Sequence, residues 1–353
     1  GFLFPEEHKK KVLIPGEDIG NDWTQLDYND SIWLEVEGGG IGFSTSITDL
    51  LDQYIVVDLE EQISGVFKSH SQIIISIICK ELSQDIISIF LYGGYGRDEG
   101  SWVIDSTSAE TKVSPYNDYD IALVVDQRID AEKLRKIEAE LLQLIDISWI
   151  DITQYTVSDL KGMKPLIKNY DLKYASKWIY GDKKILSNIP KILTEQLELK
   201  DIQILFATRL FTLVGSFDQG GLEAMQASKE MFFRNQMAKA ILAVVDCVLL
   251  QHNAYHYSYK KRVSSLPLYS QDSELIDLAD WALEEKLFPK SEAMSSQEIQ
   301  QLYIKVVDLF FRFFFVGLSK CWRKNISTVD SIEKHFMYSP INIFRRFVLS
   351  LLG

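Results

Sequence analysis

The sequence predicts an α+β protein in which a small mixed sheet is followed by an α-helical bundle and preceded by a short β-rich extension. Three observations support this fold class. The first 68 residues are rich in glycine, tryptophan and β-forming residues, the next part alternates strand-like and amphipathic stretches, and helical periodicity dominates from Ile192 onward. We therefore expect three regions, residues 1–68, 69–190 and 191–353.

The N-terminal extension combines a short strand at Lys9–Pro15 with strands and turns across Trp23–Phe43. We expect it to pack on the domain that follows, or on another subunit of a homo-oligomer. From Asp49 to Ser88 apolar residues recur at three- and four-residue spacing, which predicts a helix ahead of the sheet.

A glycine pair follows the apolar run Ile86–Leu91 and ends its strand-like character. Gly93 and Gly94 lack side chains, so the backbone can turn tightly and lie against a bulky anion. A phosphate group is the anion that this pattern favours.

Two aspartates open the strand-like segment that ends at Val125. Residues two apart on a strand point the same way, so Asp118 and Asp120 share a face, about 6–7 Å apart along the chain. Carboxylates are the ligands that Mg²⁺ prefers, and Mg²⁺ usually keeps substrate phosphates among its ligands. The pattern predicts a Mg²⁺ and triphosphate site, although such a pair also occurs at solvated strand ends.

A third carboxylate lies on the next predicted strand. An amphipathic helix over Asp130–Leu144 leads to the segment Asp146–Tyr155, whose alternation places Asp151 on the polar face. Asp151 is therefore the candidate third metal ligand and the candidate general base for an acceptor hydroxyl.

Together these stretches resemble a known family. The resemblance is to the nucleotidyltransferase core of the DNA polymerase β superfamily. It is carried by Gly93–Glu99, which reads GGYGRDE, and by Ser114–Ile121, which reads SPYNDYDI. These motifs are most similar to those of the protein uridylyltransferases of bacterial nitrogen signalling. Gly100–Val113 is an insertion that those enzymes lack, and the chain is too short for their further domains. The resemblance therefore covers the catalytic core and leaves the acceptor open.

The helical half is predicted to contain four or five helices. These are expected over Ile202–Gly215, Leu222–His252, Ser273–Leu287, Gln297–Trp322 and Ser339–Leu352. The half resembles the helical domain of antibiotic nucleotidyltransferases, which closes the cleft and supplies basic and hydroxyl groups to the triphosphate. Candidates for that role are Arg234, Lys239, Tyr259, Lys260 and Arg262, although basic residues on a helix are usually solvated.

The resemblance implies a Mg²⁺-dependent enzyme that moves a nucleoside monophosphate from an NTP, ATP among the candidates, to a hydroxyl-bearing acceptor and releases pyrophosphate. Two Mg²⁺ ions are expected, and the acceptor is a small molecule or a protein. The implied site residues are, for catalysis and metal, Asp118, Asp120 and Asp151, and for the nucleotide, Gly93, Gly94, Arg97, Lys239, Tyr259 and Lys260.

Composition limits the partners. The formal net charge of −13 argues against a protein that grips long nucleic acid, because such binding uses many Lys and Arg contacts to phosphates. Cys79, Cys247 and Cys321 show no metal-binding spacing and suggest a reducing, cytoplasmic setting. The apolar run Leu309–Leu318 is too short to cross a bilayer, so no transmembrane segment is expected.

Two other readings stay open from the sequence. The first is a catalytically inactive nucleotide-binding or regulatory protein of the same fold, against which the presence of all three aspartates counts. The second is a nucleotide second-messenger synthase or a toxin-like protein modifier.

Overall fold

The computed structural model describes residues 10–12, 34–36, 47–82, 85–105, 112–199, 201–215 and 227–332. The chain divides into two compact units, residues 1–65 and residues 66–353. The expected helix Ser339–Leu352 and most of the N-terminal extension lie outside the described residues. The expected boundary at residue 190 lies inside the second unit and stays a prediction.

The first unit contains one described pair of strands. β1 (Lys10–Val12) pairs antiparallel with β2 (Leu34–Val36). The helix α1 (Ile47–Leu82) begins in this unit and continues into the second. The predicted helix was longer at its C-terminal end, because apolar spacing alone does not distinguish a buried helix from a buried strand; the chain changes to strand at Ile86.

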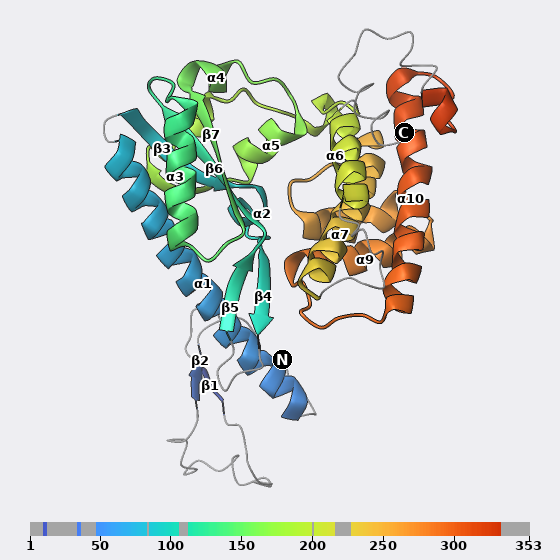
Figure 1. Ribbon diagram of the computed structural model, residues 1–353, viewed down its shortest axis with the longest axis horizontal. Helices are drawn as coiled ribbons and strands as arrows, with labels where there is room; N and C mark the ends of the chain where they lie inside the picture. Colours follow the sequence, from blue (N-terminus) through green and yellow to red (C-terminus); the bar gives the residue numbers. More distant parts are fainter. Residues whose placement is uncertain are drawn as a thin grey trace. The chain divides into compact units, whose positions relative to one another are not determined.

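The described strands of the second unit include a four-stranded mixed sheet in the order β7, β6, β3, β8 (Figure 1). β3 (Ile86–Tyr92) runs antiparallel to β6 (Asp118–Val125) and to β8 (Lys177–Gly181). β6 runs parallel to β7 (Trp149–Thr156), and the crossover between them contains α3 (Ala131–Leu144). The predicted α+β class is confirmed.

One face of this sheet is apolar and lies against α1 and α3. Tyr119 and Ile121 on β6 are fully buried there, and His70 of α1 forms a hydrogen bond of 3.0 Å with the Tyr119 hydroxyl. The two helices are joined by a bond of 3.1 Å from Lys80 to Glu140. The opposite face of β6 carries Asp118 and Asp120 at the start of the strand and the buried Ala122 and Val124 further along it.

Short elements link the strands. The glycine-rich turn forms α2 (Gly93–Gly96), and β7 is followed by α4 (Val157–Lys161) and α5 (Ile167–Tyr174). The 3₁₀ turns Ile185–Asn188 and Thr194–Gln196 follow β8.

The predicted insertion Gly100–Val113 contributes to a β-hairpin. β4 (Ser101–Asp105) and β5 (Lys112–Tyr116) pair antiparallel with each other. The residues between these two strands lie outside the described part of the chain. The hairpin thus places the insertion directly between the glycine turn and the aspartate strand.

The helical half contains α6 (Asp201–Gly215), α7 (Ala227–Gln251), α8 (Tyr259–Ser265), α9 (Ser273–Leu287) and α10 (Ser296–Trp322). Four of these match predicted helices, and α8 was not predicted. α7 is in contact with each of α6, α8, α9 and α10. Most of its side chains are buried, as expected for a helix that neighbours surround.

Substitution of the glycine at the end of β8 tests the register between β8 and β3. Gly181 has φ +79°, and an added Cβ would overlap the Ile87 carbonyl oxygen of β3. We expect Gly181→Ala to lower the free energy of unfolding by about 2 kcal/mol, because a left-handed backbone and a clash act together. Urea unfolding followed by circular dichroism measures this change.

Gly65, within α1, is the matched control. An added Cβ there meets nothing within 4 Å, and alanine is the better helix former, so Gly65→Ala should raise stability by up to about 1 kcal/mol. Equal effects of the two substitutions would contradict the assigned register of β3 and β8.

Candidate active site

Two neighbouring strands carry the three predicted aspartates. Asp118 and Asp120 lie on β6, and Asp120 is the register partner of Asp151 on the parallel strand β7. Paired residues of parallel strands project to the same side of a sheet. The three carboxylates therefore share the face opposite α1 and α3, as the sequence predicted.

The backbone before β6 positions Asp118. Asn117 has φ +81°, a left-handed conformation that asparagine tolerates better than most residues. Its side-chain amide donates a hydrogen bond to the Asp118 carboxylate. Asn117 thus separates the hairpin strand β5 from β6 and orients the first aspartate.

The first glycine of the motif makes room for Asp120. Gly93 has φ +63°, and a Cβ at this position would overlap the Asp120 carboxylate oxygen Oδ2. The neighbouring Gly94 has less free space than an alanine needs, since its Cβ would lie 3.1 Å from the Glu99 carbonyl oxygen. The glycine turn therefore lies directly against the aspartate strand.

The charge on Asp120 is unfavourable in this environment. Burial, followed by the charges of Asp118 and Asp151, raises the pKa of the Asp120 carboxyl from 3.8 to about 7. The positive charges of Arg97 and Lys239 act in the opposite direction. A nearby cation would therefore stabilise the charged form of this buried carboxylate.

Two lysines of the helical half interact electrostatically with these aspartates, and an arginine acts on both lysines. Burial lowers the pKa of Lys239, on α7, to about 8, and the charge of Asp118 opposes that shift. Burial likewise lowers the pKa of Lys286, on α9, to about 8, against the charges of Asp118 and Asp120. Arg209 on α6 acts on both lysines, and its Nε is buried without a hydrogen-bond partner.

Of these cations only Lys239 was predicted. Lys286 ends a charged stretch of α9, where sequence alone favours a solvated side chain, yet it is 6% exposed and donates a hydrogen bond of 2.6 Å to the Ser101 hydroxyl. Arg209 lies within an apolar helix with no accompanying motif. Only an isolated charge in an otherwise apolar helix could have drawn attention to it.

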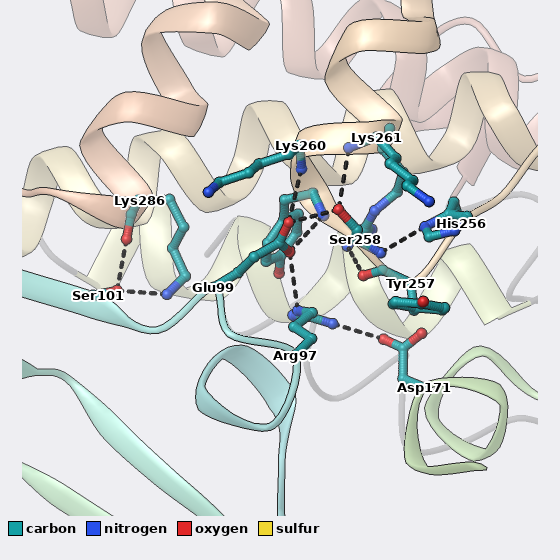
Figure 2. A network of polar contacts seen from close by, with 12 residues as sticks. Arg97, Glu99, Ser101, Asp171, His256, Tyr257, Ser258, Lys260, Lys261 and Lys286 are labelled. Atoms are coloured by element: carbon teal, nitrogen blue, oxygen red, sulfur yellow. Dashed lines mark hydrogen bonds and ion pairs between the residues drawn. The ribbon is translucent and has the colours of Figure 1, made fainter. Parts of the chain in front are cut away.

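Arg97 and Glu99, at the end of the segment Gly93–Glu99, lie in a buried polar network (Figure 2). The Arg97 guanidinium donates to Asp171 of α5 at 3.0 Å, and its Nε lies 3.6 Å from Glu99. The Tyr255 hydroxyl donates to the same Asp171 carboxylate at 3.1 Å. The Arg97 side chain thus binds Asp171 and lies beside Glu99. Its positive charge acts on Asp120 at longer range.

The predicted nucleotide-binding residues of α8 also take part in this network. Two guanidinium groups lie over the Tyr259 ring, with Arg97 4.3 Å and Arg262 4.1 Å from its centroid. The backbone N–H groups of Tyr259 and Lys260 donate to the Glu99 carboxylate. Contact of Arg97, Tyr259 or Lys260 with a nucleotide stays a prediction.

Two further basic candidates are buried in ion pairs. Arg262 pairs with Asp246 of α7. Arg234 lies 3.2 Å from both Glu230 and Glu285. The expectation that such residues are solvated is wrong for both, because carboxylates inside the helical half compensate their charges.

The described residues contain no group of three or more His, Cys, Asp or Glu side chains placed to hold a metal ion. Asp118, Asp120 and Asp151 are thus not gathered into a three-carboxylate cage, and the metal set stays a prediction. Within the described helices, none has the length and apolar character that a membrane span requires.

Comparison with known proteins gives a remote structural similarity. No protein-family model matches the sequence, and no curated protein matches it. Among solved structures, the chain is similar to spectinomycin adenyltransferase AAD(9) from Enterococcus faecialis, crystallised with ATP and spectinomycin. The identity is 14%, the TM-score is 0.42, and the match covers 72% of this chain and 98% of the other. The functional assignment therefore rests on the site residues themselves.

The raised pKa of Asp120 predicts a pH-dependent effect on stability. The carboxyl ionises near its ordinary value of 3.8 in the unfolded chain and near 7 in the folded protein. Between these values the free energy of unfolding falls as pH rises, and the loss is complete above about pH 7. In the presence of a chelator, Asp120→Asn should therefore raise that free energy by about 2 kcal/mol at pH 8 and have little effect near pH 4.

Asp126, an exposed carboxylate just after the same strand, provides the control. Asp126→Asn should change the free energy of unfolding by less than about 0.5 kcal/mol at either pH. A destabilised Asp120→Asn at pH 8, measured by urea unfolding, would show that the Asp120 charge is not unfavourable.

Proposed function

We propose that this protein transfers a nucleoside monophosphate from a nucleoside triphosphate to a hydroxyl-bearing acceptor, with release of pyrophosphate. The observation that carries the proposal is the interaction of opposite charges at one site. Asp118 and Asp120 interact electrostatically with Lys239 and Lys286, which come from helices more than a hundred residues later in the chain. A triphosphate with its metal suits this arrangement.

The lysines suit the phosphate groups. Burial weakens the positive charge of Lys239 and of Lys286, as their lowered pKa values near 8 indicate. Phosphate oxygens placed between them would accept charge-assisted hydrogen bonds and stabilise the protonated form of both lysines. The glycine turn at Gly93 and Gly94 would add backbone N–H groups on the side of the sheet.

The aspartates suit Mg²⁺. This ion commonly takes one or two protein carboxylates and completes its octahedral shell with water and phosphate oxygens. Asp120 supports this fit, because its charged form is disfavoured until a positive charge such as Mg²⁺ lies beside it. When bound, Mg²⁺ would offset negative charge on the transferring phosphoryl group, and Asp118 and Asp120 would hold it.

Asp151 is the proposed group for the acceptor. It lies on the same face as Asp120, one strand further along the sheet, and it is exposed. An exposed carboxylate at this position can accept the proton of a hydroxyl that enters from solvent. The acceptor is then a small molecule or a protein segment that reaches the β7 side of the site.

Nucleotide binding tests the proposal. Calorimetry with each of the four nucleoside triphosphates and Mg²⁺ should show metal-dependent binding of at least one of them to the wild type. The double variant Asp118→Ala/Asp120→Ala should lose at least about a hundredfold in affinity, because both proposed metal ligands are gone. Asp126→Asn is the control and should bind like the wild type.

If none of the four triphosphates binds, with or without Mg²⁺, the transferase proposal is wrong. Binding that the double variant retains would place the nucleotide elsewhere in the protein.

Replacement of one lysine tests the phosphate contact. Lys239→Gln should weaken nucleotide binding about tenfold, the effect expected for loss of one charge-assisted hydrogen bond. Affinity of the wild type should fall as pH rises through about 8, because Lys239 and Lys286 lose their protons there. Titration by calorimetry at several pH values measures both effects.

Lys305→Gln, on the exposed side of α10, is the matched control and should leave affinity unchanged. A wild-type affinity that stays constant from pH 7 to pH 9.5 would count against phosphate binding by these buried lysines; those two values bracket the lowered pKa of about 8.

A further inference from the structure

One short segment connects the glycine turn to the helical half. The backbone N–H of Glu99 donates to the Gly94 carbonyl at 2.8 Å. Two residues later, the Ser101 hydroxyl donates to the Lys286 carbonyl of α9 at 2.7 Å. The segment Arg97–Ser101 therefore contacts the proposed phosphate-binding turn at one end and a proposed phosphate-binding helix at the other.

The Glu99 carboxylate binds the first turn of α8 (Figure 2). It accepts hydrogen bonds from the Ser258 hydroxyl at 2.6 Å, from the Tyr259 N–H at 2.6 Å and from the Lys260 N–H at 3.0 Å. Glu99 is 4% exposed, and Arg97 lies beside it. A carboxylate from the motif thus satisfies backbone donors that a helix N-terminus leaves without intrahelical partners.

α8 is in turn fixed to the helix that carries Lys239. Arg262 of α8 is 1% exposed and forms its ion pair with Asp246 of α7. A displacement of α8 would therefore break a buried ion pair or move α7 with it, and both are costly. The position of Glu99 is linked to that of Lys239 through this helix pair.

We propose that Glu99 is a positioning residue that couples the glycine turn to the phosphate-binding lysines. Its backbone holds Gly94 and its carboxylate holds α8, so nucleotide binding at the turn and docking of α8 stabilise each other. This inference rests on the proposed nucleotide site. Glu99 acts through α8 and α7, because its carboxylate binds α8.

Coupling of this kind is reciprocal. If docked α8 favours nucleotide binding, then bound nucleotide must protect α8 by the same factor. The amide protons of Tyr259 and Lys260 report this directly, since both donate to Glu99. Their exchange with deuterium should slow when the Mg²⁺–triphosphate complex binds.

The experiment combines amide exchange and calorimetry on the full chain. In Glu99→Ala, the Tyr259 and Lys260 amides should exchange at least about tenfold faster, because three hydrogen bonds to a buried charge are lost. The dissociation constant of the Mg²⁺–triphosphate complex should rise about tenfold.

Two variants accompany this one. Asp98→Asn changes the adjacent residue, which is exposed and pairs with Lys177 on the core, so exchange and affinity should match the wild type. Glu99→Gln keeps one acceptor oxygen and should recover part of the affinity. Should Glu99→Ala fail to fold, Ser258→Ala removes one of the three donors and should give a smaller change in the same direction.

The outcomes separate the inference from the proposed function. Unchanged exchange at Tyr259 and Lys260 in Glu99→Ala overturns the docking role. Faster exchange with unchanged nucleotide affinity overturns the coupling while the transferase proposal stands. A wild type that binds none of the four triphosphates overturns both.

Discussion

The site is governed by the cost of burying the Asp120 carboxylate beside other negative charges. Asp120 lies against the backbone of Gly93 with two other aspartates nearby, and its charged form is disfavoured. The protein meets part of this cost with Lys239 and Lys286, whose own burial is unfavourable. The negative and positive charges lower the cost of burying each other. This compensation requires the sheet and the helical half to keep a fixed relative position.

The Glu99 carboxylate, through its hydrogen bonds to α8, joins these two parts, and buried ion pairs stabilise each of them. Arg97 and Asp171 join the glycine-turn segment to α5, and Arg262 and Asp246 join α8 to α7. Removal of one partner from such a pair leaves an uncompensated buried charge, at a cost of about 3–5 kcal/mol. Both guanidinium groups also lie over the Tyr259 ring, whose π-electrons attract them. The network therefore fixes a relative position as well as contributing to stability.

Local patterns were sufficient to predict much of the fold. Alternation placed Asp118, Asp120 and Asp151 on the right strands, and helical periodicity located most helices of the second half. Such patterns depend on neighbours within a few residues, which the sequence displays directly. The change from α1 to β3 was placed too late, because an isoleucine-rich segment suits both a buried helix and a buried strand.

Contacts across long separations could not be predicted in this way. Lys286 and Ser101 are separated by 185 positions, and nothing in either segment identifies the other. Glu99 and Ser258 are separated by 159. A charged residue in an amphipathic helix is normally solvated, so its burial becomes visible only when the opposing surface is known.

The segment Gly93–Glu99 therefore serves two roles that its sequence alone does not distinguish: it makes room for the Asp120 carboxylate, and it binds α5 and α8. Gly93 is required because the Asp120 carboxylate occupies the place of a side chain. Arg97 and Glu99 follow within six residues, yet their side chains point to α5 and α8. Because one short segment serves both the carboxylates and the helices, a movement at either end is transmitted to the other. A site built from two separate parts of the chain needs such a connection if both are to meet the same ligand.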